Sequence, residues 1–325
     1  MGWSVMGTVT IAAEQMVAAI RALGHVPLWV VSRSARDATQ FAEDLSIPQA
    51  TTDMKRVWQD SAVTAAYVSA ARRRRPHYIS AAAGARKDIL CDGPISESSK
   101  GADALVQLCE DAGVLLAVNQ PFRASVIHQT MKRLIADGDI GTVQSVLMVR
   151  GGPYQPPPNR RKHELDETGQ IHLDVSVDDI DLARFLTDAE PSEANALAEQ
   201  SVKDPDHIAY AIRMSDGSLF QAHESFRTAD IDSMVLVAGD RGVLIANGTL
   251  NGRASGTLVR KIGGKSELVP VRERDLHLAT VEDFVTARDR APSWLSTGAD
   301  SVVALRGAEA VAMSARKGRT IAVQT

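Results

Sequence analysis

The stretch Trp3-Ser4-Val5-Met6-Gly7-Thr8-Val9-Thr10-Ile11-Ala12 determines the fold class. It begins with a short apolar run, typical of a buried strand, and continues into a turn at Gly7. Residues 11–23 then carry apolar side chains at helical spacing, and Gly24 stands where a left-handed residue often ends a helix. Strand, glycine turn and helix in this order are typical of a nucleotide-binding βαβ unit.

The same alternation of strand and helix patterns continues to about residue 119. Strands that recur through helical crossovers form a parallel sheet with helices on both faces. We therefore predict an α/β N-terminal Rossmann domain with a doubly wound parallel sheet over residues 1–120. Its strands are expected at 3–6, 27–31, 65–69, 88–91 and 114–119, and its helices at 11–23, 35–45, 76–83 and 100–112.

The pattern changes in the second half, which we assign to a domain over residues 121–325. A helix is expected near 125–136, a strand at 143–150 and a helix from about residue 174. Alternating runs at 193–198, 207–214, 218–224, 234–238 and 242–247 are separated by hairpin-type turns such as Ser215-Asp216-Gly217-Ser218. This pattern predicts an α+β domain with a mostly antiparallel open sheet, and helices at 278–290 and 301–315 that pack back on the first domain.

The composition excludes several classes of function. The 325 residues carry a net charge of only −4 and 4% aromatic residues, so neither nucleic acid nor a membrane surface is an expected partner. No apolar run approaches the roughly 20 residues of a membrane span, and the N-terminus lacks the basic start of a signal peptide. Two cysteines, Cys91 and Cys109, favour a reducing cytoplasm, and no residues have a diagnostic metal-ligand spacing.

Two segments carry a family resemblance: Ile89-Leu90-Cys91-Asp92-Gly93-Pro94 and the run from Asp174 to Leu186. Together with Asp137-Gly138-Asp139-Ile140-Gly141, Gly239-Asp240-Arg241-Gly242 and the tail 314–319, they resemble the glucose-fructose oxidoreductase/inositol dehydrogenase/MocA (Gfo/Idh/MocA) family. The resemblance covers nearly the whole chain and is nearest to the 1,5-anhydro-fructose-reductase-like branch, whose glycine-rich turn is also depleted.

The resemblance implies hydride transfer between a nicotinamide cofactor and a small carbonyl or hydroxyl substrate that resembles a sugar. The family usually reads Glu-Lys-Pro at the first segment and Asp-x-x-x-His-Asp at the second, and its Lys and His contact the reacting oxygen. Here Gly93 and Asp178 stand at those positions. Two alternatives therefore stay open: a catalytically silent nucleotide-binding sensor or partner subunit, and a nicotinamide-assisted lyase or glycosidase.

The expected cofactor contacts follow the carboxyl ends of the predicted strands. Gly7 is retained in the dinucleotide turn, whereas β-branched Val9 replaces the second glycine and crowds the approach of the pyrophosphate. The full predicted set is Gly7, Thr8, Val9, Thr10, Ile11, Ser32, Arg33, Ser34, Ser69, Ala70, Arg72, Arg75, Asp92, Gly93, Pro94, Asn119 and Arg123.

The end of the second strand favours NADP(H), with NAD(H) as the alternative. NAD sites place an acid there for the ribose 2′-hydroxyl, but Ser32-Arg33-Ser34-Ala35-Arg36 contains none before Asp37. Arg33 suits a 2′-phosphate, although an ordinary solvated turn is the simpler alternative. The four arginines from Arg72 to Arg75 could bind an anionic substrate or a cofactor phosphate. Alternatively, two of them point to solvent and two pair with carboxylates.

Asp174, Asp178 and His172 are the predicted catalytic residues. Asp174 and Asp178 lie four apart on one expected helix face, where paired carboxylates can raise a pKa enough to retain a proton. The structural alternatives are an N-cap role for Asp174 and a core role for His172. Arg161 and Lys162, together with Asp174 and Asp178, are the predicted substrate contacts.

The second-domain sheet also predicts assembly. The resemblance implies that its open face pairs with another subunit, and Met234, Leu236 and Ala238 would lie on that face. We therefore expect a homodimer or tetramer.

Overall fold

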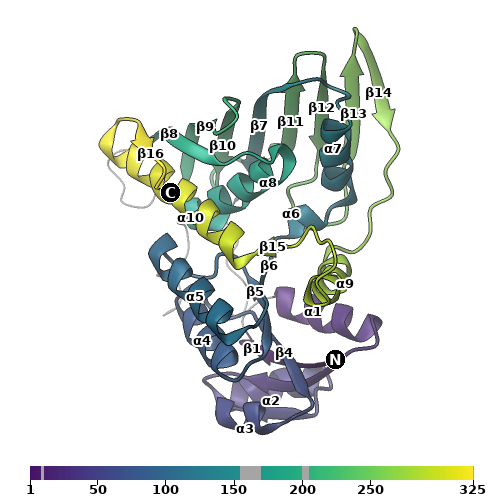
Figure 1. The fold of residues 1–325 in the computed structure, drawn as a ribbon, viewed down its shortest axis with the longest axis vertical. Coiled ribbons are helices and arrows are strands. Elements are labelled where there is room, and N and C mark those ends of the chain that lie inside the picture. Colours follow the sequence, from purple (N-terminus) through teal and green to yellow (C-terminus); the bar gives the residue numbers. More distant parts are fainter. Residues whose placement is uncertain (9–10, 154–169, 200–204, 325) are drawn as a thin grey trace. The chain divides into compact units, whose positions relative to one another are not determined.

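The computed structural model describes residues 1–8, 11–153, 170–199 and 205–324. These residues form two compact units. Residues 1–8, 11–120 and 277–302 make up the first unit, and residues 121–153, 170–199, 205–276 and 303–324 make up the second. A segment late in the chain therefore completes the N-terminal unit. Figure 1 gives the element labels used below.

The first unit is built on a parallel sheet, which in the described residues has seven strands in the order β15-β6-β5-β4-β1-β2-β3. Its parallel strands are β1 (Gly2–Met6), β2 (Val26–Val31), β3 (Gln49–Thr51), β4 (Val63–Val68), β5 (Asp88–Asp92) and β6 (Leu116–Asn119). The two-residue strand β15 (Ser296–Thr297) adds antiparallel to β6. The buried β1 pattern and the crossovers confirm the predicted doubly wound sheet.

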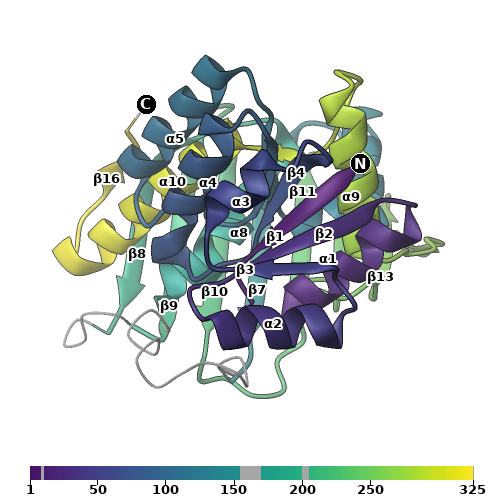
Figure 2. The ribbon, with the colours of Figure 1, turned by 90° about the horizontal axis from the view of Figure 1, so that it is seen from below.

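Helices cover both faces of this sheet (Figure 2). The helices of the unit are α1 (Ile11–Ala22), α2 (Ala35–Asp44), α3 (Met54–Gln59), α4 (Arg75–Gly84), α5 (Ser99–Ala112) and α9 (Leu276–Arg288), with a short 3₁₀ turn η1 (Arg72–Arg74) before α4. On one face, α1, α2 and α9 pack on the strands through a core in which Trp3 and Phe284 have ring centroids 5.1 Å apart. On the other face, α4 packs against α5 and β5. The sheet is thus buried on both sides, as its near-continuous apolar strands require.

The second unit contains an open mixed sheet, with nine strands among the described residues in the order β14-β13-β12-β11-β7-β10-β9-β8-β16. The strands are β7 (Val143–Gly151), β8 (Pro191–Ala198), β9 (His207–Met214), β10 (Leu219–Ser225), β11 (Met234–Gly239), β12 (Gly242–Asn247), β13 (Thr257–Ile262), β14 (Lys265–Val269) and β16 (Ile321–Ala322). The β7–β10 pair is parallel and the other pairs are antiparallel, which confirms the predicted sheet type. The β13–β14 hairpin was not predicted.

One face of this sheet is covered by helices (Figure 1). The helical segments are α6 (Pro121–Ala124), α7 (Val126–Ala136), the π-helical segment η3 (His172–Ser176), α8 (Val177–Thr187) and α10 (Gly298–Lys317). Alternate residues of β7, including Val146 and Met148, are fully buried on the covered face. The next residue of that series is Arg150, so a cation lies in register with the core-facing side chains.

Candidate active site

Gly7 shapes the turn that follows β1. Its φ is +106°, and a Cβ at this position would lie 2.7 Å from the Ser69 carbonyl oxygen and 2.8 Å from the Cα of Ala70. No side chain fits such a close approach between the ends of β1 and β4. Beside it, the Thr8 hydroxyl lies 3.4 Å from that of Ser32. The carboxyl ends of β1, β2 and β4 therefore lie together, at the place where doubly wound sheets bind ligands. Five predicted cofactor contacts meet there: Gly7, Thr8, Ser32, Ser69 and Ala70. The missing side chain at Gly7 thus lets the ends of β1 and β4 lie close together, and a dinucleotide at this turn stays a prediction.

The end of β2 carries an exposed arginine between two serines. The Ser34 side chain accepts a hydrogen bond of 3.2 Å from the backbone N–H of Asp37 and thereby caps α2. Arg33 stands just before this cap and is exposed. Burial raises the pKa of Tyr78, and the cations Arg74 and Arg33 partly offset that rise. Arg33 and Arg74 thus both act electrostatically on the Tyr78 hydroxyl, and an anion at the end of β2 stays a prediction.

The arginine run after β4 has mixed roles. Arg72 and Arg75 are buried, whereas Arg73 is exposed. The Nε of Arg75 donates to the Ala70 carbonyl oxygen at 3.0 Å, and its Nη1 donates to the carbonyl oxygens of Gly93 and Pro94 at 2.7 and 2.8 Å. Arg75 therefore fixes the backbone after β5 through carbonyl acceptors rather than carboxylates. A cofactor contact of Arg72 or Arg75 stays a prediction.

A buried carboxylate, Asp92, organises the ends of β4, β5 and β6. It accepts hydrogen bonds from the Tyr67 hydroxyl at 2.7 Å, the Ser69 hydroxyl at 2.9 Å and the Asn119 amide nitrogen at 3.1 Å. Burial, with the neighbouring charge of Asp92, raises the pKa of Tyr67 well above its ordinary value. Tyr67 therefore stays protonated and keeps donating. Three donors to one carboxylate hold the three strand ends in register.

Gly93 and Gln120 lie face to face at the next position along these strands. A Cβ on Gly93 would lie 3.0 Å from Nε2 of Gln120 and 3.3 Å from Cγ1 of Val118. Gln120 is 3% exposed and Asn119 is 8% exposed. In the part of the chain that the structure describes, neither Gln120 Nε2 nor Asn119 Oδ1 has a hydrogen-bond partner. The sequence pattern did not identify Gln120, although a polar residue directly after a buried strand and beside Asn119 is a usable signal.

The predicted catalytic residues of the second unit lie around an irregular helix start. η3 is π-helical, and within it the Asp174 backbone N–H donates to the Gln170 carbonyl oxygen at 2.9 Å. The N-cap interpretation of Asp174 is therefore wrong, because α8 begins only at Val177. His172, Asp174 and Asp178 are each partly exposed, whereas the residues between them are buried. The three side chains thus share the accessible side of this segment.

Arg150 links Asp178 to a buried acidic cluster. Its Nη1 lies 3.7 Å from Oδ2 of Asp178 and 3.2 Å from Oδ1 of Asp179. Asp179 is fully buried, as is Glu224, which pairs with Arg150 in the β7–β10 register. Glu224 accepts hydrogen bonds from the hydroxyls of Ser176 and, at 2.6 Å, Tyr210. A cation therefore sits between one partly exposed carboxylate and two buried ones.

Electrostatics sets the protonation of this cluster. Burial and the nearby charge of Asp179 raise the pKa of Glu224 well above its ordinary value. Burial also raises the pKa of Asp179, and Arg150 offsets part of that rise. Like charges this close favour retention of one proton by the pair. Raised carboxyl pKa values thus occur at Asp179, next to Asp178 in the sequence, and at Glu224, opposite Arg150 in the β7–β10 register. The proton shared by Asp174 and Asp178 stays a prediction.

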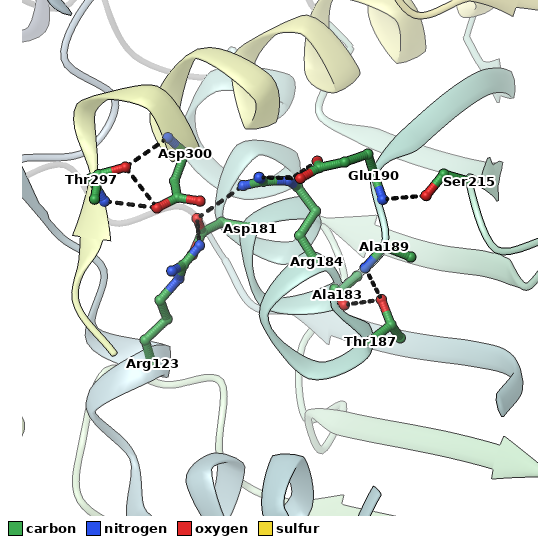
Figure 3. Close-up of polar contacts among 10 residues, drawn as sticks. All are labelled: Arg123, Asp181, Ala183, Arg184, Thr187, Ala189, Glu190, Ser215, Thr297 and Asp300. Atoms are coloured by element: carbon green, nitrogen blue, oxygen red, sulfur yellow. Dashed lines mark hydrogen bonds and ion pairs between the residues drawn. The ribbon is translucent and has the colours of Figure 1, made fainter. Parts of the chain in front are cut away.

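Arg123, a predicted cofactor contact, lies on α6 of the second unit. Its Nε and Nη2 donate to the two carboxylate oxygens of Asp181, each at 2.7 Å (Figure 3). Both side chains are buried. Beyond Asp181 along α8, Arg184 donates from Nη2 to Glu190 at 2.8 Å. Arg123 therefore fastens α6 to α8, and its contact with a cofactor stays a prediction.

Several predicted residues have no structural account. Val9, Thr10, Arg161 and Lys162 lie outside the described residues. Ile11 is the first residue of α1.

Within the described ranges, no three His, Cys, Asp or Glu side chains are grouped so that they could hold a metal ion. The same ranges contain no helix with the length and apolar character needed to cross a membrane.

Comparison with family models gives two matches that follow the two halves of the chain. Residues 1–120 match the model described as an oxidoreductase family with an NAD-binding Rossmann fold. Residues 128–245 match the GFO/IDH/MocA C-terminal domain. The matches confirm the family resemblance and the predicted fold class.

Similar proteins span the chain from end to end. The chain is 28% identical to 1,5-anhydro-D-fructose reductase of Ensifer adhaerens over 99% of this chain and 98% of that protein, which supports the predicted branch. It is 23% identical to D-xylose 1-dehydrogenase (NADP(+)) 2 of Haloferax volcanii, with 99% of each chain covered. Among solved structures, aldose-aldose oxidoreductase from Caulobacter crescentus superposes with a TM-score of 0.87 at 20% identity, over 99% of both chains. That structural likeness supports the fold.

Proposed function

Because the chain belongs to the Gfo/Idh/MocA family and is an NAD(P)-dependent oxidoreductase, we propose that it transfers a hydride between NADP(H) and a sugar-like carbonyl or hydroxyl compound. The observation that carries the proposal is the end-to-end similarity to a sugar reductase and a sugar dehydrogenase. The turn at Gly7 is consistent with it, since it follows β1 and precedes α1, the place at which doubly wound sheets bind dinucleotides.

The preference for NADP(H) rests on the end of β2. Arg33 is exposed, Ser32 and Ser34 flank it, and the first carboxylate, Asp37, comes only inside α2. A guanidinium that forks onto a 2′-phosphate contributes about 1.5–3 kcal/mol, which corresponds to roughly 10- to 100-fold in affinity. The Haloferax volcanii relative is named for NADP(+), which supports the same choice.

We propose Asp178 as the group that exchanges the proton, with Asp174 and His172 beside it on the accessible side of η3 and α8. Arg150 Nη1 lies 3.7 Å from Oδ2 of Asp178 and holds this carboxylate in place. An ionised carboxylate can take the proton of a substrate hydroxyl during oxidation and return it during reduction. Arg161 and Lys162 are proposed as substrate contacts on the resemblance alone.

The proposed assembly is a homodimer or tetramer through the uncovered face of the second-unit sheet. Leu147, Leu236, Ile245, Val259 and Leu268 are aligned as cross-strand partners from β7 to β14. None of the five is buried, and Leu268 is 65% exposed. A continuous apolar row of this kind is typical of a protein–protein interface.

Cofactor titration tests the proposed function. NADPH and NADH are titrated into the wild-type protein, Arg33→Ala and Arg316→Ala, which removes an exposed arginine at the end of α10. We expect NADPH to bind at least several-fold tighter than NADH, and Arg33→Ala to abolish that preference while Arg316→Ala retains it. Equal affinities in the wild-type protein would remove the NADP(H) assignment. Binding without turnover of any sugar-like compound would favour the silent nucleotide-binding protein.

A further inference from the structure

Two buried polar groups at the carboxyl ends of β5 and β6 lack the partners that buried groups normally have. Gln120 is 3% exposed and Asn119 is 8% exposed. Across residues 1–8, 11–153, 170–199 and 205–324, no atom pairs with Gln120 Nε2 or with Asn119 Oδ1. Most buried polar side-chain atoms are hydrogen-bonded, because desolvation without a partner is unfavourable. One unpaired donor and one unpaired acceptor on consecutive residues therefore require an explanation.

The surroundings hold both residues in place. Asn119 is fixed through its amide nitrogen, which donates to Asp92 at 3.1 Å, so its oxygen cannot turn toward that carboxylate. The Gln120 backbone N–H donates to the Val118 carbonyl oxygen at 3.0 Å, which turns the chain at the end of β6. The Gln120 amide then lies over Gly93, where a Cβ would come within 3.0 Å of Nε2. Because Gly93 has no side chain, the Gln120 amide can occupy this position.

We propose that Gln120 forms a substrate-oxygen contact of the first unit, beside Asn119, which stays a predicted cofactor contact. Gln120 Nε2 donates to a carbonyl or hydroxyl oxygen of a polyhydroxy substrate. The proposal rests on the proposed function, because it assigns a substrate contact to that reaction.

The chemistry of an amide defines what Gln120 contributes. In reduction, the carbonyl carbon gains the hydride of the reduced cofactor, the π electrons move to the oxygen, and the oxygen takes a proton from an acid. A fixed N–H donor stabilises the charge that develops on that oxygen. An amide neither gains nor loses a proton near neutral pH, so Gln120 polarises the substrate and leaves the proton to another group, the role proposed above for Asp178.

The test uses Gln120→Met, which keeps the length of the side chain and removes its polar atoms. Gln107→Met is the matched control, because Gln107 is exposed on α5 of the same unit and its side chain donates to Asp111 at 2.9 Å, one helical turn away. The probes are NADPH-dependent reduction of 1,5-anhydro-D-fructose and calorimetric binding of 1,5-anhydro-D-glucitol to the protein saturated with NADP⁺. Thermal unfolding without ligands is the third measurement.

We expect kcat/KM to fall about 10²-fold in Gln120→Met, the scale of losing one positioned donor, and polyol binding to weaken at least about tenfold. NADPH affinity is expected to stay unchanged. Without ligands the Tm of Gln120→Met should equal or exceed that of the wild type, because the Nε2 donor that it removes has no partner in the described chain. Gln107→Met should match the wild type in turnover and binding.

Two results would overturn the proposal: a clear drop in the ligand-free Tm, which would mean that the amide is a structural partner, or unchanged turnover and polyol binding in Gln120→Met. If the wild type binds the polyol but does not reduce the carbonyl probe, the proposed function fails. The oxygen site is then tested by polyol binding alone, which should still weaken in Gln120→Met. A wild-type protein that binds neither probe overturns both. As a second variant, Gly93→Ala should reproduce the loss, since its Cβ displaces the amide.

Discussion

Replacing Arg150 by Met should expose the energetic role of the buried acidic cluster. Arg150 lies 3.2 Å from Asp179, which is fully buried, and its guanidinium stands 4.8 Å from the centre of the Phe122 ring. Methionine keeps much of the apolar contact but removes the charge. Removing one partner of a buried ion pair costs about 3–5 kcal/mol of unfolding free energy. Because 23% of the Arg150 side chain is exposed, we expect the lower end, about 3 kcal/mol at neutral pH.

The cost should depend on pH with a definite sign. Asp179 and Glu224 have pKa values raised by burial in the folded protein, so the folded state holds protons that the unfolded state has already released. The free energy of unfolding therefore falls, through these two carboxyl groups, as pH rises above the ordinary carboxyl pKa of about 4. The charge of Arg150 lowers the pKa of both carboxyl groups, so its removal should raise both pKa values further. The difference between wild type and Arg150→Met should thus be largest near pH 7–8 and shrink toward pH 4.

The assay is guanidinium unfolding of both proteins across this pH range, with Arg213→Met as the matched control. Arg213 lies on β9 of the same sheet and pairs with Glu193 at 2.7 Å, but both side chains are exposed, at 57% and 42%. Such a pair contributes at most about 1 kcal/mol. A cost for Arg150→Met no larger than that of Arg213→Met, or one that does not change with pH, would refute the buried-cluster reasoning.

Two further predictions concern catalysis and assembly. Asp178→Asn should lower kcat about 10²-fold and leave NADPH affinity intact. Asp137→Asn, which loses an exposed 3.7 Å pair with Arg133, should match the wild type, and normal turnover in Asp178→Asn would reject the proposed proton exchange. Leu236→Glu should shift the mass measured by light scattering toward the monomer, while Leu108→Glu, at an exposed position of α5, should not. A wild-type protein that is already monomeric at micromolar concentration would contradict the assembly proposal.

The sequence predicted the layers of the fold better than its local irregularities. Apolar runs and helical spacing identified the five longer parallel strands of the first sheet, because they are buried on both sides, but missed the short elements β3, α3 and β15. The β13–β14 hairpin was missed since β14 is almost entirely exposed and lacks an alternating pattern. The π-helical η3 was also missed, because no residue type marks a change from helical to π-helical turns.

The site was predictable only in part. Gly7 and the arginine after β2 could be located from a turn and a strand end. The Arg150 cluster could not, because its members come from β7, α8 and β10, and only the register that pairs Arg150 with Glu224 brings them together. Gln120 was overlooked since its role depends on what is absent at Gly93 across the neighbouring strand. Pairings between distant segments require a register that local patterns do not contain.

The central claim, hydride transfer from NADPH to a sugar-like carbonyl, is tested most directly by isotope transfer. NADPH carrying deuterium at C4 of the nicotinamide, prepared in each of the two stereochemical forms, is incubated with the wild-type protein and 1,5-anhydro-D-fructose. The mass of the product is then measured by mass spectrometry. The account predicts one deuterium on the reduced carbon from one of the two forms only. Bound NADPH with no transfer of label from either form, to this sugar or to other carbonyl sugars, would contradict it.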